Sequence, residues 1–195
     1  MWRVDHLNVR AARWHDDPFR YVAFDDVLDD TSLSQLMTVL DEEPVEHYAS
    51  DIFAFDATAP EPTTDAFRAL RSEFAAALAP LLSTASGQSV SRVDMRAFAY
   101  RPGHYLLPHT DCQEGLGRVL AYIFYLPTPE VPVGGELELY RCEAEGGELV
   151  TINSAKLVEP RPNRLVVFEV SEVSLHQVRE VMSGLRLSLA GWFYR

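Results

Sequence analysis

The chain has 195 residues, of which 47% are hydrophobic and 24% charged, and these are ordinary values for one globular domain with a sizeable core. Its net charge of −12 and its single lysine, Lys156, argue against a nucleic-acid partner, because phosphate binding depends on clustered cations. The polar start, the absence of a long apolar run and the presence of only two cysteines, Cys112 and Cys142, predict a soluble, cytoplasmic protein with reduced thiols and no membrane partner.

The first 89 residues predict a mixed segment of helices and strands that supports the rest of the chain. Residues 1–17 have no regular pattern, and residues 19–28 and 51–55 favour short strands. Between these strands, capping residues at 29–31 precede the apolar stripe of a short helix, which ends before Pro44 and consists of Leu33, Leu36, Met37 and Leu40. A second helix is expected from about residue 65 to 82, with an apolar face of Phe67, Leu70, Phe74, Leu78 and Leu81.

From residue 90 onward, short apolar segments alternate with turns rich in proline and glycine. The predicted strands cover residues 92–100, 105–111, 118–126, 135–140, 148–152, 156–159, 164–169, 173–178 and 185–194. Evenly spaced strands after two helices predict an α+β, mostly β protein whose second half is a sandwich or jelly roll. We therefore expect a single domain over 1–195, with 1–89 as support and 90–195 as the β core.

A candidate metal site begins with His109 and Asp111, whose side chains leave the same face of an extended strand. With His176 they would provide two imidazoles and one carboxylate, the facial triad that holds iron(II) and leaves coordination positions open for chemistry. A second pair of this spacing, His15 and Asp17, lies in a polar stretch without a strand pattern or a distant partner. The spacing alone is a weak signal, and we do not expect that pair to bind metal.

A candidate anion site lies ten residues after His176, where Arg186 and Ser188 share one face of a predicted strand and leucines occupy the other. A guanidinium is a fixed fork suited to a carboxylate, so this pair would suit the far end of a dicarboxylate such as 2-oxoglutarate. The alternative is that Arg186 pairs with a core Asp or Glu. The residues therefore favour an oxygenase that depends on iron and 2-oxoglutarate.

These motifs together resemble the prolyl 4-hydroxylase-like 2-oxoglutarate/iron(II) oxygenases. The resemblance spans residues 100–193 and rests on Tyr100-x-Pro-Gly-x-Tyr-Leu-x-Pro-His109-x-Asp111, Arg118 with Tyr125-Leu126, Gly134-Gly135-Glu-Leu137, Asn163-Arg164-Leu-x-x-Phe168, His176-Gln-Val178 and Arg186-Leu-Ser188-x-x-Gly191-Trp192-Phe193. Pro18-Phe19, Asp51-Ile-Phe-Ala-Phe55 and the closing Gly-Trp-Phe are similar to the branch that hydroxylates a prolyl residue of a ribosomal protein. That branch normally carries a second, non-catalytic barrel, and this sequence covers the first.

The resemblance implies a double-stranded β-helix core flanked by the N-terminal helices. It implies iron(II) bound by His109, Asp111 and His176. It also implies 2-oxoglutarate bound by Arg186 with Ser188, Tyr125 and Tyr100, dioxygen as the second cosubstrate and ascorbate as an accessory reductant. The implied reaction converts 2-oxoglutarate to succinate and carbon dioxide and hydroxylates an unactivated C–H, most simply of a prolyl residue in a protein or peptide. Tyr125 could instead be an ordinary core aromatic, and we expect Trp192 to serve in packing.

Several rival functions remain to be weighed. The presence of Asp111 disfavours halogenation, since the related halogenases lack the carboxylate, and Trp192 stands where the nucleic-acid repair relatives tend to have a second arginine. The substrate could be a free or carrier-bound amino acid or another small molecule, and a non-catalytic cupin-like binding module is a further alternative. A different metal enzyme on the same barrel usually relies on three or more histidines, and His47 and His104 lack suitable partners in the sequence.

Overall fold

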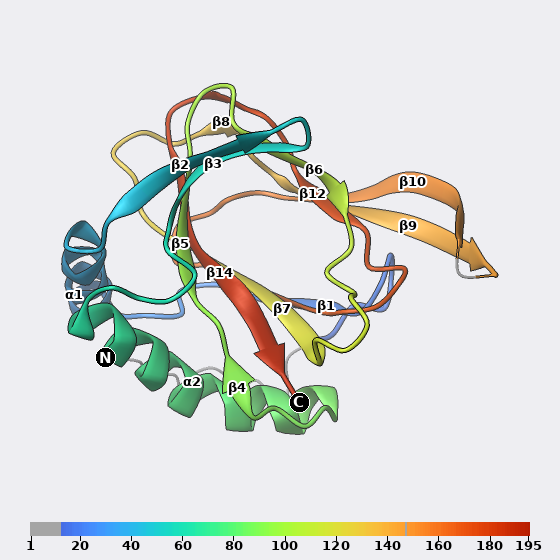
Figure 1. The fold of residues 1–195 in the computed structure, drawn as a ribbon, viewed down its shortest axis with the longest axis horizontal. Coiled ribbons are helices and arrows are strands. Elements are labelled where there is room, and N and C mark those ends of the chain that lie inside the picture. The colour runs from blue at the N-terminus through green and yellow to red at the C-terminus, as the bar shows by residue number, and fades with distance from the viewer. Residues whose placement is uncertain (1–12, 147) are drawn as a thin grey trace.

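A long antiparallel sheet curls around a central space and carries two helices on its outside (Figure 1). This computed structural model describes residues 13–146 and 148–195, so residues 1–12 of the predicted lead-in lie outside the described range. The elements of the N-terminal half are β1 (Tyr21–Phe24), α1 (Asp30–Asp41), β2 (Val45–Ser50), β3 (Phe53–Thr58) and α2 (Asp65–Ser86). The later strands are β4 (Arg92–Val93), β5 (Arg96–Tyr100), β6 (Tyr105–His109), β7 (Arg118–Tyr125), β8 (Val133–Gly134), β9 (Leu137–Glu145), β10 (Glu148–Val158), β11 (Leu165–Glu169), β12 (His176–Val178), β13 (Val181–Ser183) and β14 (Arg186–Tyr194).

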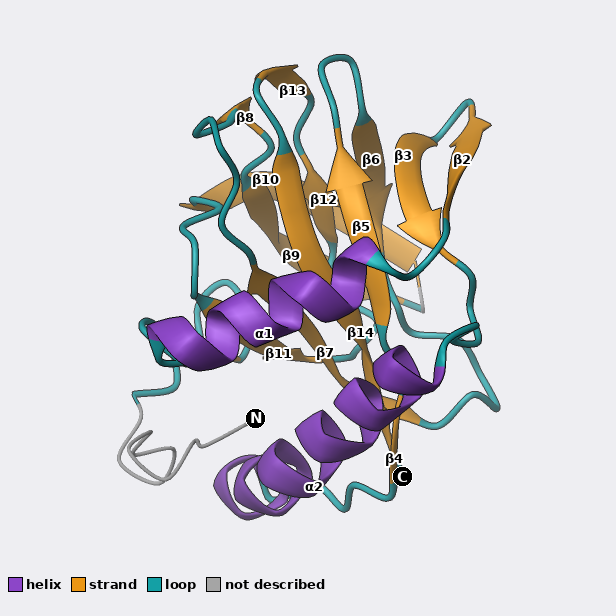
Figure 2. Cartoon of the chain, turned by 90° about the vertical axis from the view of Figure 1, so that its left-hand side faces the viewer, coloured by secondary structure: helices purple, strands orange, loops and turns teal. Residues whose placement is uncertain are grey.

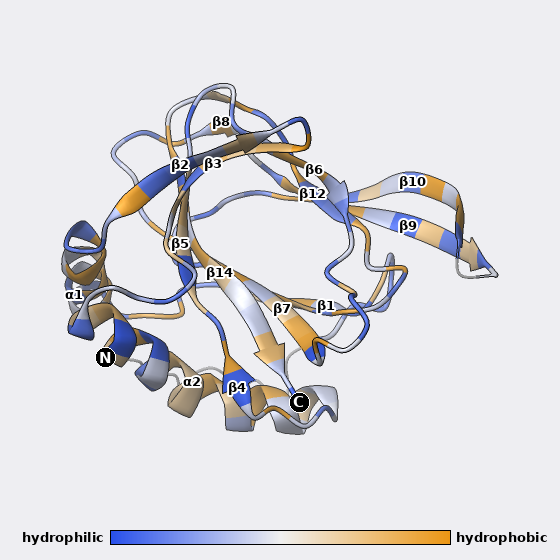
Figure 3. Ribbon diagram, viewed as in Figure 1, coloured by the Kyte–Doolittle hydropathy of each residue, from blue (hydrophilic) through white to orange (hydrophobic). Residues whose placement is uncertain are grey.

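The sheet brings segments from both halves of the sequence together. Its order is β1-β11-β7-β14-β5-β3-β6-β12-β9-β10, with β2 added to β3 and β4 added to β14, and β8 pairs separately with β13. The β9–β10 hairpin projects from the barrel, and Figure 3 shows that it alternates between hydrophobic and hydrophilic residues, whereas β7 is mostly apolar. The barrel wall thus includes β1 and β3, which belong to the N-terminal segment 1–89 that was expected only to support the β core.

Both helices begin at side-chain caps and pack against the outside of the sheet (Figure 2). Asp29 accepts a hydrogen bond of 2.7 Å from the backbone N–H of Ser32 at the start of α1, and Thr64 caps α2 in the same way. The second helix continues to Ser86, beyond the predicted end, and stops at Gly87, which has a positive φ of 74°. Leu82, not Leu81, is buried, because it lies one helical turn after Leu78.

The alternation along the central strands decides which side chains enter the barrel. Leu120, Phe124 and Leu189 point outward and pack under the helices. Their neighbours on β7 and β14 point inward and include Ile123, Tyr125, Arg186, Ser188 and Ala190. The prediction that Arg186 and the leucines beside it on β14 face opposite sides of the sheet is therefore confirmed.

The predicted strands were correct in place but not always in length. The two strands expected within residues 148–159 form one long strand, β10, with two irregularities in its pairing to β9. The strand expected over 92–100 is interrupted between β4 and β5. β2 was not predicted, because its sequence, Val-Glu-His-Tyr-Ala-Ser, is largely polar and exposed and shows no clear alternation. Neither α1 nor α2 combines the length and the apolar composition that a membrane-spanning helix needs.

Candidate active site

Three side chains converge at one end of the paired strands β6 and β12, and we call them the inner triad: His109, Asp111 and His176. His109 lies directly opposite His176 in the β6–β12 register, and Asp111 follows two residues after the end of β6. Nε2 of His109 lies 3.8 Å from one carboxylate oxygen of Asp111, and Nε2 of His176 lies 3.6 Å from the other. The sequence predicted this convergence, although the strand expected to reach Asp111 ends at His109.

Hydrogen bonds orient both imidazole rings of the inner triad. Nδ1 of His109 lies 2.9 Å from the carbonyl oxygen of Leu107, and Nδ1 of His176 lies 2.9 Å from that of Ser174. A carbonyl only accepts hydrogen bonds, so each Nδ1 carries the proton and each Nε2 keeps a free lone pair directed at Asp111. Burial lowers the pKa of His176 and keeps its ring neutral, although the nearby Asp111 opposes this effect. Neutral imidazoles with free Nε2 atoms and one carboxylate could hold iron(II).

A buried cation lies further inside the barrel. Arg186 is only 2% exposed, and its Nε has no hydrogen-bond partner within the described part of the chain. Arg186 lies opposite Tyr100 in the β14–β5 register, and Ser188 lies opposite Tyr125 in the β14–β7 register. The guanidinium carbon lies 4.8 Å from the ring centre of Tyr100 and 5.0 Å from that of Tyr125, and Nη1 donates a hydrogen bond of 3.4 Å to the Ser188 hydroxyl.

No carboxylate neutralises this cation, since Arg186 forms no ion pair with any residue of 13–146 or 148–195. The alternative of a core Asp or Glu partner is therefore not observed there. The hydroxyl of Tyr125 is also buried without a partner among these residues. Burial raises the pKa of Tyr125 and raises that of Tyr100 to about 12, so both hydroxyls stay protonated and can donate hydrogen bonds. Unpaired buried donors of this kind are costly unless a ligand satisfies them, and an anionic carboxylate would do so.

Gly135 makes room for the arginine side chain. It has a positive φ of 73°, and a Cβ at this position would lie 2.9 Å from both Cδ of Arg186 and Cγ2 of Val181. A side chain larger than that of glycine at position 135 would therefore displace the aliphatic part of the Arg186 side chain.

A single cavity of about 460 Å³ joins the inner triad to the arginine site. Its lining includes all three triad residues together with Arg186, Ser188 and Tyr100. The remaining walls are largely apolar, with an aromatic side formed by Phe53, Phe55 and Phe98. A polar end inside an apolar cavity would fix the orientation of a small ligand and exclude water.

Residues 95–194 match the family model described as the 2OG-Fe(II) oxygenase superfamily. The chain belongs to this superfamily. Membership implies iron(II), 2-oxoglutarate and dioxygen, as the sequence predicted.

Within the superfamily, the chain is similar to proteins named for proline hydroxylation. It is 42% identical over 117 residues to the prolyl 3-hydroxylase OGFOD1 of Mus musculus, a match that covers 58% of this chain and 21% of the mouse protein. It is 31% identical over 201 residues to the prolyl 3,4-dihydroxylase OGFOD1 of Ostreococcus tauri, covering 91% of this chain and 38% of that protein. The chain thus spans between about a fifth and two fifths of the length of these curated relatives.

Solved structures of the superfamily share the fold. A prolyl-4-hydroxylase from Pseudomonas putida superposes with a TM-score of 0.68 at 21% identity, over 90% of this chain and 92% of that one. A prolyl hydroxylase from Trichoplax adhaerens, solved with a peptide fragment of hypoxia inducible factor, superposes with a TM-score of 0.66 at 15% identity, over 89% and 83%. The predicted mostly β, double-stranded β-helix architecture with flanking helices is confirmed.

Superfamily membership does not by itself predict the whole cavity wall, and the sequence did not show that Phe53, Phe55 and Arg96 face the cavity. Phe53 and Phe55 lie in a strand that was predicted, but an aromatic residue facing a cavity has the same pattern as one facing a core. Arg96 also lines the cavity: its guanidinium lies between the rings of Tyr48 and Phe98, and its Nη2 is buried without a partner among the described residues.

Trp192, which was expected to pack, borders the cavity as well as the core. Its ring lies 3.6 Å from the guanidinium carbon of Arg118. Arg118 in turn donates a hydrogen bond of 3.3 Å to the backbone carbonyl of Asp111, so this stacked pair supports the loop that carries the triad carboxylate.

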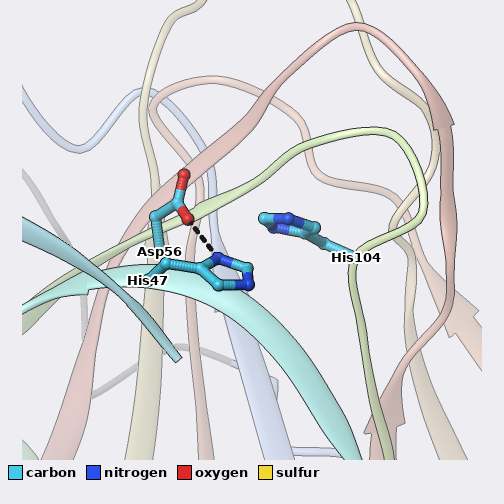
Figure 4. A group of neighbouring side chains, drawn as sticks. All are labelled: His47, Asp56 and His104. Carbon is cyan, nitrogen blue, oxygen red and sulfur yellow. Dashed lines mark hydrogen bonds and ion pairs between the residues drawn. The ribbon is translucent and has the colours of Figure 1, made fainter. Parts of the chain in front are cut away.

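A second group of two histidines and one aspartate, which we call the outer cluster, lies away from the cavity and consists of His47, Asp56 and His104 (Figure 4). The expectation that His47 and His104 lack suitable partners was wrong. Nδ1 of His47 lies 2.8 Å from a carboxylate oxygen of Asp56, and the ring centres of His47 and His104 are 5.3 Å apart. The β2–β3 pairing that joins His47 to Asp56 depends on the strand that the sequence did not reveal.

Proposed function

We propose that this protein is a 2-oxoglutarate- and iron(II)-dependent hydroxylase that acts on a prolyl residue of a protein or peptide. The observation that carries the proposal is one cavity that combines the inner triad with the unpaired, buried Arg186. A metal-binding module without activity would need the triad but not a second, costly buried cation in the same cavity.

In this proposal His109, Asp111 and His176 bind iron(II) through two Nε2 atoms and one carboxylate oxygen. Their Nδ1–H bonds to the carbonyls of Leu107 and Ser174 hold the rings in place before the metal arrives. The bound iron would supply the activation of dioxygen that hydroxylation of an unactivated C–H requires.

Arg186 would bind the carboxylate of 2-oxoglutarate that is remote from the metal. Its Nε and the Tyr125 hydroxyl are buried donors without partners among the described residues. Ser188 lies beside Arg186 on β14, and Tyr100 lies opposite Arg186 on β5. A bidentate contact with the guanidinium would fix the cosubstrate along the cavity axis, so that its 2-oxo acid end faces the triad.

The aromatic side of the cavity supports a proline ring as the group to be hydroxylated. Phe53, Phe55 and Phe98 offer flat, apolar surfaces that suit an uncharged saturated ring and exclude water from the reacting carbon. The names of the mouse and Ostreococcus relatives point to proline in the same way. We infer that a prolyl residue of a ribosomal protein is the first substrate to test.

The test has two stages. Anaerobic addition of iron(II) and then 2-oxoglutarate to the metal-free protein should produce the visible charge-transfer band of a chelated 2-oxo acid only when both are present. Oxygen is then admitted with proline-containing peptides or with matched peptides in which alanine replaces the proline, and succinate and peptide mass are measured. We expect a mass gain of one oxygen only in the proline peptides.

The other outcomes separate the alternatives. Oxidation of free proline or of another amino acid in preference to peptides would favour a small-molecule hydroxylase. A charge-transfer band without succinate, or no iron bound at all, would favour a binding module and reject the proposal.

A further inference from the structure

The outer cluster draws its three members from three separate segments. His47 and Asp56 are cross-strand partners on β2 and β3, and His104 lies in the turn between β5 and β6. Figure 4 shows the His104 ring turned toward the pair. One ligand atom from each residue can be chosen so that all three lie within 4.8 Å of one another. None of the three residues lines the cavity, because Asp56 faces away from the side on which Phe55 enters it.

Two features of this cluster favour a ligand over a simple ion-pair network. Nδ1 of His104 is buried and has no hydrogen-bond partner within the described chain, and a buried polar atom is costly to leave unpaired. The Asp56 carboxylate is held by Arg101, whose Nε donates a hydrogen bond of 2.8 Å to Oδ2. Oδ1 is the oxygen directed at His47, so the arginine orients the carboxylate without covering that atom.

The Asp56 carboxylate also carries its charge at neutral pH. Burial alone would raise the pKa of Asp56, but the hydrogen bonds from His47 and Arg101 and the nearby His104 together lower it. The cluster therefore offers an ionised oxygen ligand beside two imidazoles.

We propose that His47, Asp56 and His104 form a second divalent metal site, distinct from the inner triad and suited to zinc. Two imidazole nitrogens and one carboxylate oxygen are a zinc ligand set, with water in the fourth position. His47, whose side chain is 58% exposed, provides access for the ion and the water. For zinc bonds of about 2.0–2.1 Å, the ligand atoms must approach one another to about 3.3 Å, and rotation of the exposed His47 side chain supplies this movement.

The bound ion would link the β2–β3 hairpin to the turn between β5 and β6. On one side, the turn carrying His104 is already fixed to β13, because Gly103 donates to the carbonyl of Val181 and Val181 donates to that of His104, at 2.8 and 3.0 Å. On the other side, β3 is the only strand among the described residues that pairs with β2. A metal at the outer cluster would therefore clamp the β2–β3 hairpin, which contributes Phe53 and Phe55 to the cavity wall, to the turn that precedes β6.

The test counts zinc ions bound per chain after equilibrium dialysis of the metal-free protein against zinc. We expect two for the wild type, one for His109→Ala, which disables the inner triad, and one for His104→Ala or His47→Gln, which disable the outer cluster. His15→Ala is the matched control, because His15 stacks on Tyr21 outside both groups, and it should still bind two. His47→Gln, at the most exposed of the three positions, keeps the test valid if His104→Ala fails to fold.

A second measurement distinguishes a built site from loose surface binding. In the His109→Ala background, cobalt(II) should give the intense visible absorption of a four-coordinate ion, and adding His47→Gln should abolish it. One zinc per wild-type chain that is lost in His109→Ala and kept in His104→Ala would overturn the proposal. So would cobalt spectra unchanged by His47→Gln. Neither readout requires turnover, so the result does not depend on the proposed hydroxylase activity.

Discussion

The inner triad and the outer cluster each contain two histidines and one aspartate, in surroundings that give them different capacities. In the inner triad, backbone carbonyls bind both Nδ1 atoms, so two Nε2 lone pairs and a buried carboxylate face one point. In the outer cluster, Nδ1 of His47 is hydrogen-bonded to Asp56 itself, and Arg101 donates a second hydrogen bond to the same carboxylate.

The position of each group matters as much as its hydrogen bonds. The inner triad opens into a cavity that also holds a buried guanidinium, and the outer cluster includes the solvent-exposed His47. The first arrangement suits a reactive metal with free coordination positions and a second ligand site. The second suits a metal that keeps one water ligand and links segments of the chain. Two histidines and one aspartate therefore do not by themselves determine what a site does. Their hydrogen bonds and the residues around them must also be known.

The largest expected difference in turnover is between two variants that each lose a carboxylate, one from the inner triad and one from the outer cluster. Asp111→Ala is expected to reduce turnover to background, since the chain loses the charged ligand of the triad and with it iron. Asp56→Ala, the matched change in the outer cluster, should keep turnover near the wild-type level. Iron content and succinate formation measure both variants. Equal loss of turnover in the two variants, or wild-type turnover in Asp111→Ala, would contradict the assignment of separate roles.

The next effect concerns the buried cation that only the inner group possesses. Arg186→Lys replaces a fork with a point charge and should weaken 2-oxoglutarate binding about 10- to 100-fold, equivalent to about 1.4–3 kcal/mol for a charged hydrogen bond. Iron binding should be unchanged. Titration of the charge-transfer band measures the affinity. Arg96→Lys is the control, because Arg96 lies on the aromatic side of the cavity, and an equal loss in that variant would remove the special role of Arg186.

A smaller effect is expected where the backbone makes room for the inner site. Gly135→Ala places a Cβ 2.9 Å from Arg186 Cδ, and Gly146→Ala places one in open space at a similar positive φ. The φ penalty of about 1–2 kcal/mol is common to both, and overpacking should add about 1–3 kcal/mol to Gly135→Ala alone. Urea unfolding measures the difference, and 2-oxoglutarate affinity should fall only in Gly135→Ala. Equal unfolding free energies would show that the stem of Arg186 moves aside freely.

The sequence predicted the inner site because its spacing encodes it directly. Arg186 and Ser188 share a strand face, so the period of two places them without knowledge of the fold. His109 and Asp111 are only two residues apart, so they stay close although β6 ends at His109. His176 is distant in sequence, and it was predicted as the third ligand because it lies after His109 and Asp111 and before Arg186. The register that sets His176 opposite His109 could not be read from the sequence, because β12 has only three residues.

The outer cluster and the aromatic wall escaped prediction for different physical reasons. The contact between His47 and Asp56 depends on β2, whose exposed residues lack an alternating pattern, so there was no signal of a neighbouring strand. Phe53 and Phe98 were detectable as strand residues, but burial against a core and exposure to a cavity leave the same apolar pattern. The sequence therefore predicted the polar residues of the site better than the apolar residues that line the cavity around them.

The smallest expected effect lies in the outer cluster when no metal is present. His47→Gln removes an exposed ion pair with Asp56, which should change the free energy of unfolding by about 0–1 kcal/mol in buffer containing a chelator. Added zinc should stabilise the wild type more than the variant, because the variant keeps the inner triad but lacks one ligand of the outer cluster. Urea unfolding with and without zinc measures both quantities. A loss well above 1 kcal/mol in chelator would mean that the cluster stabilises the two hairpins through its hydrogen bonds alone. The contrast with the inner triad would then be between a metal centre and an ion-pair network, not between two metal sites.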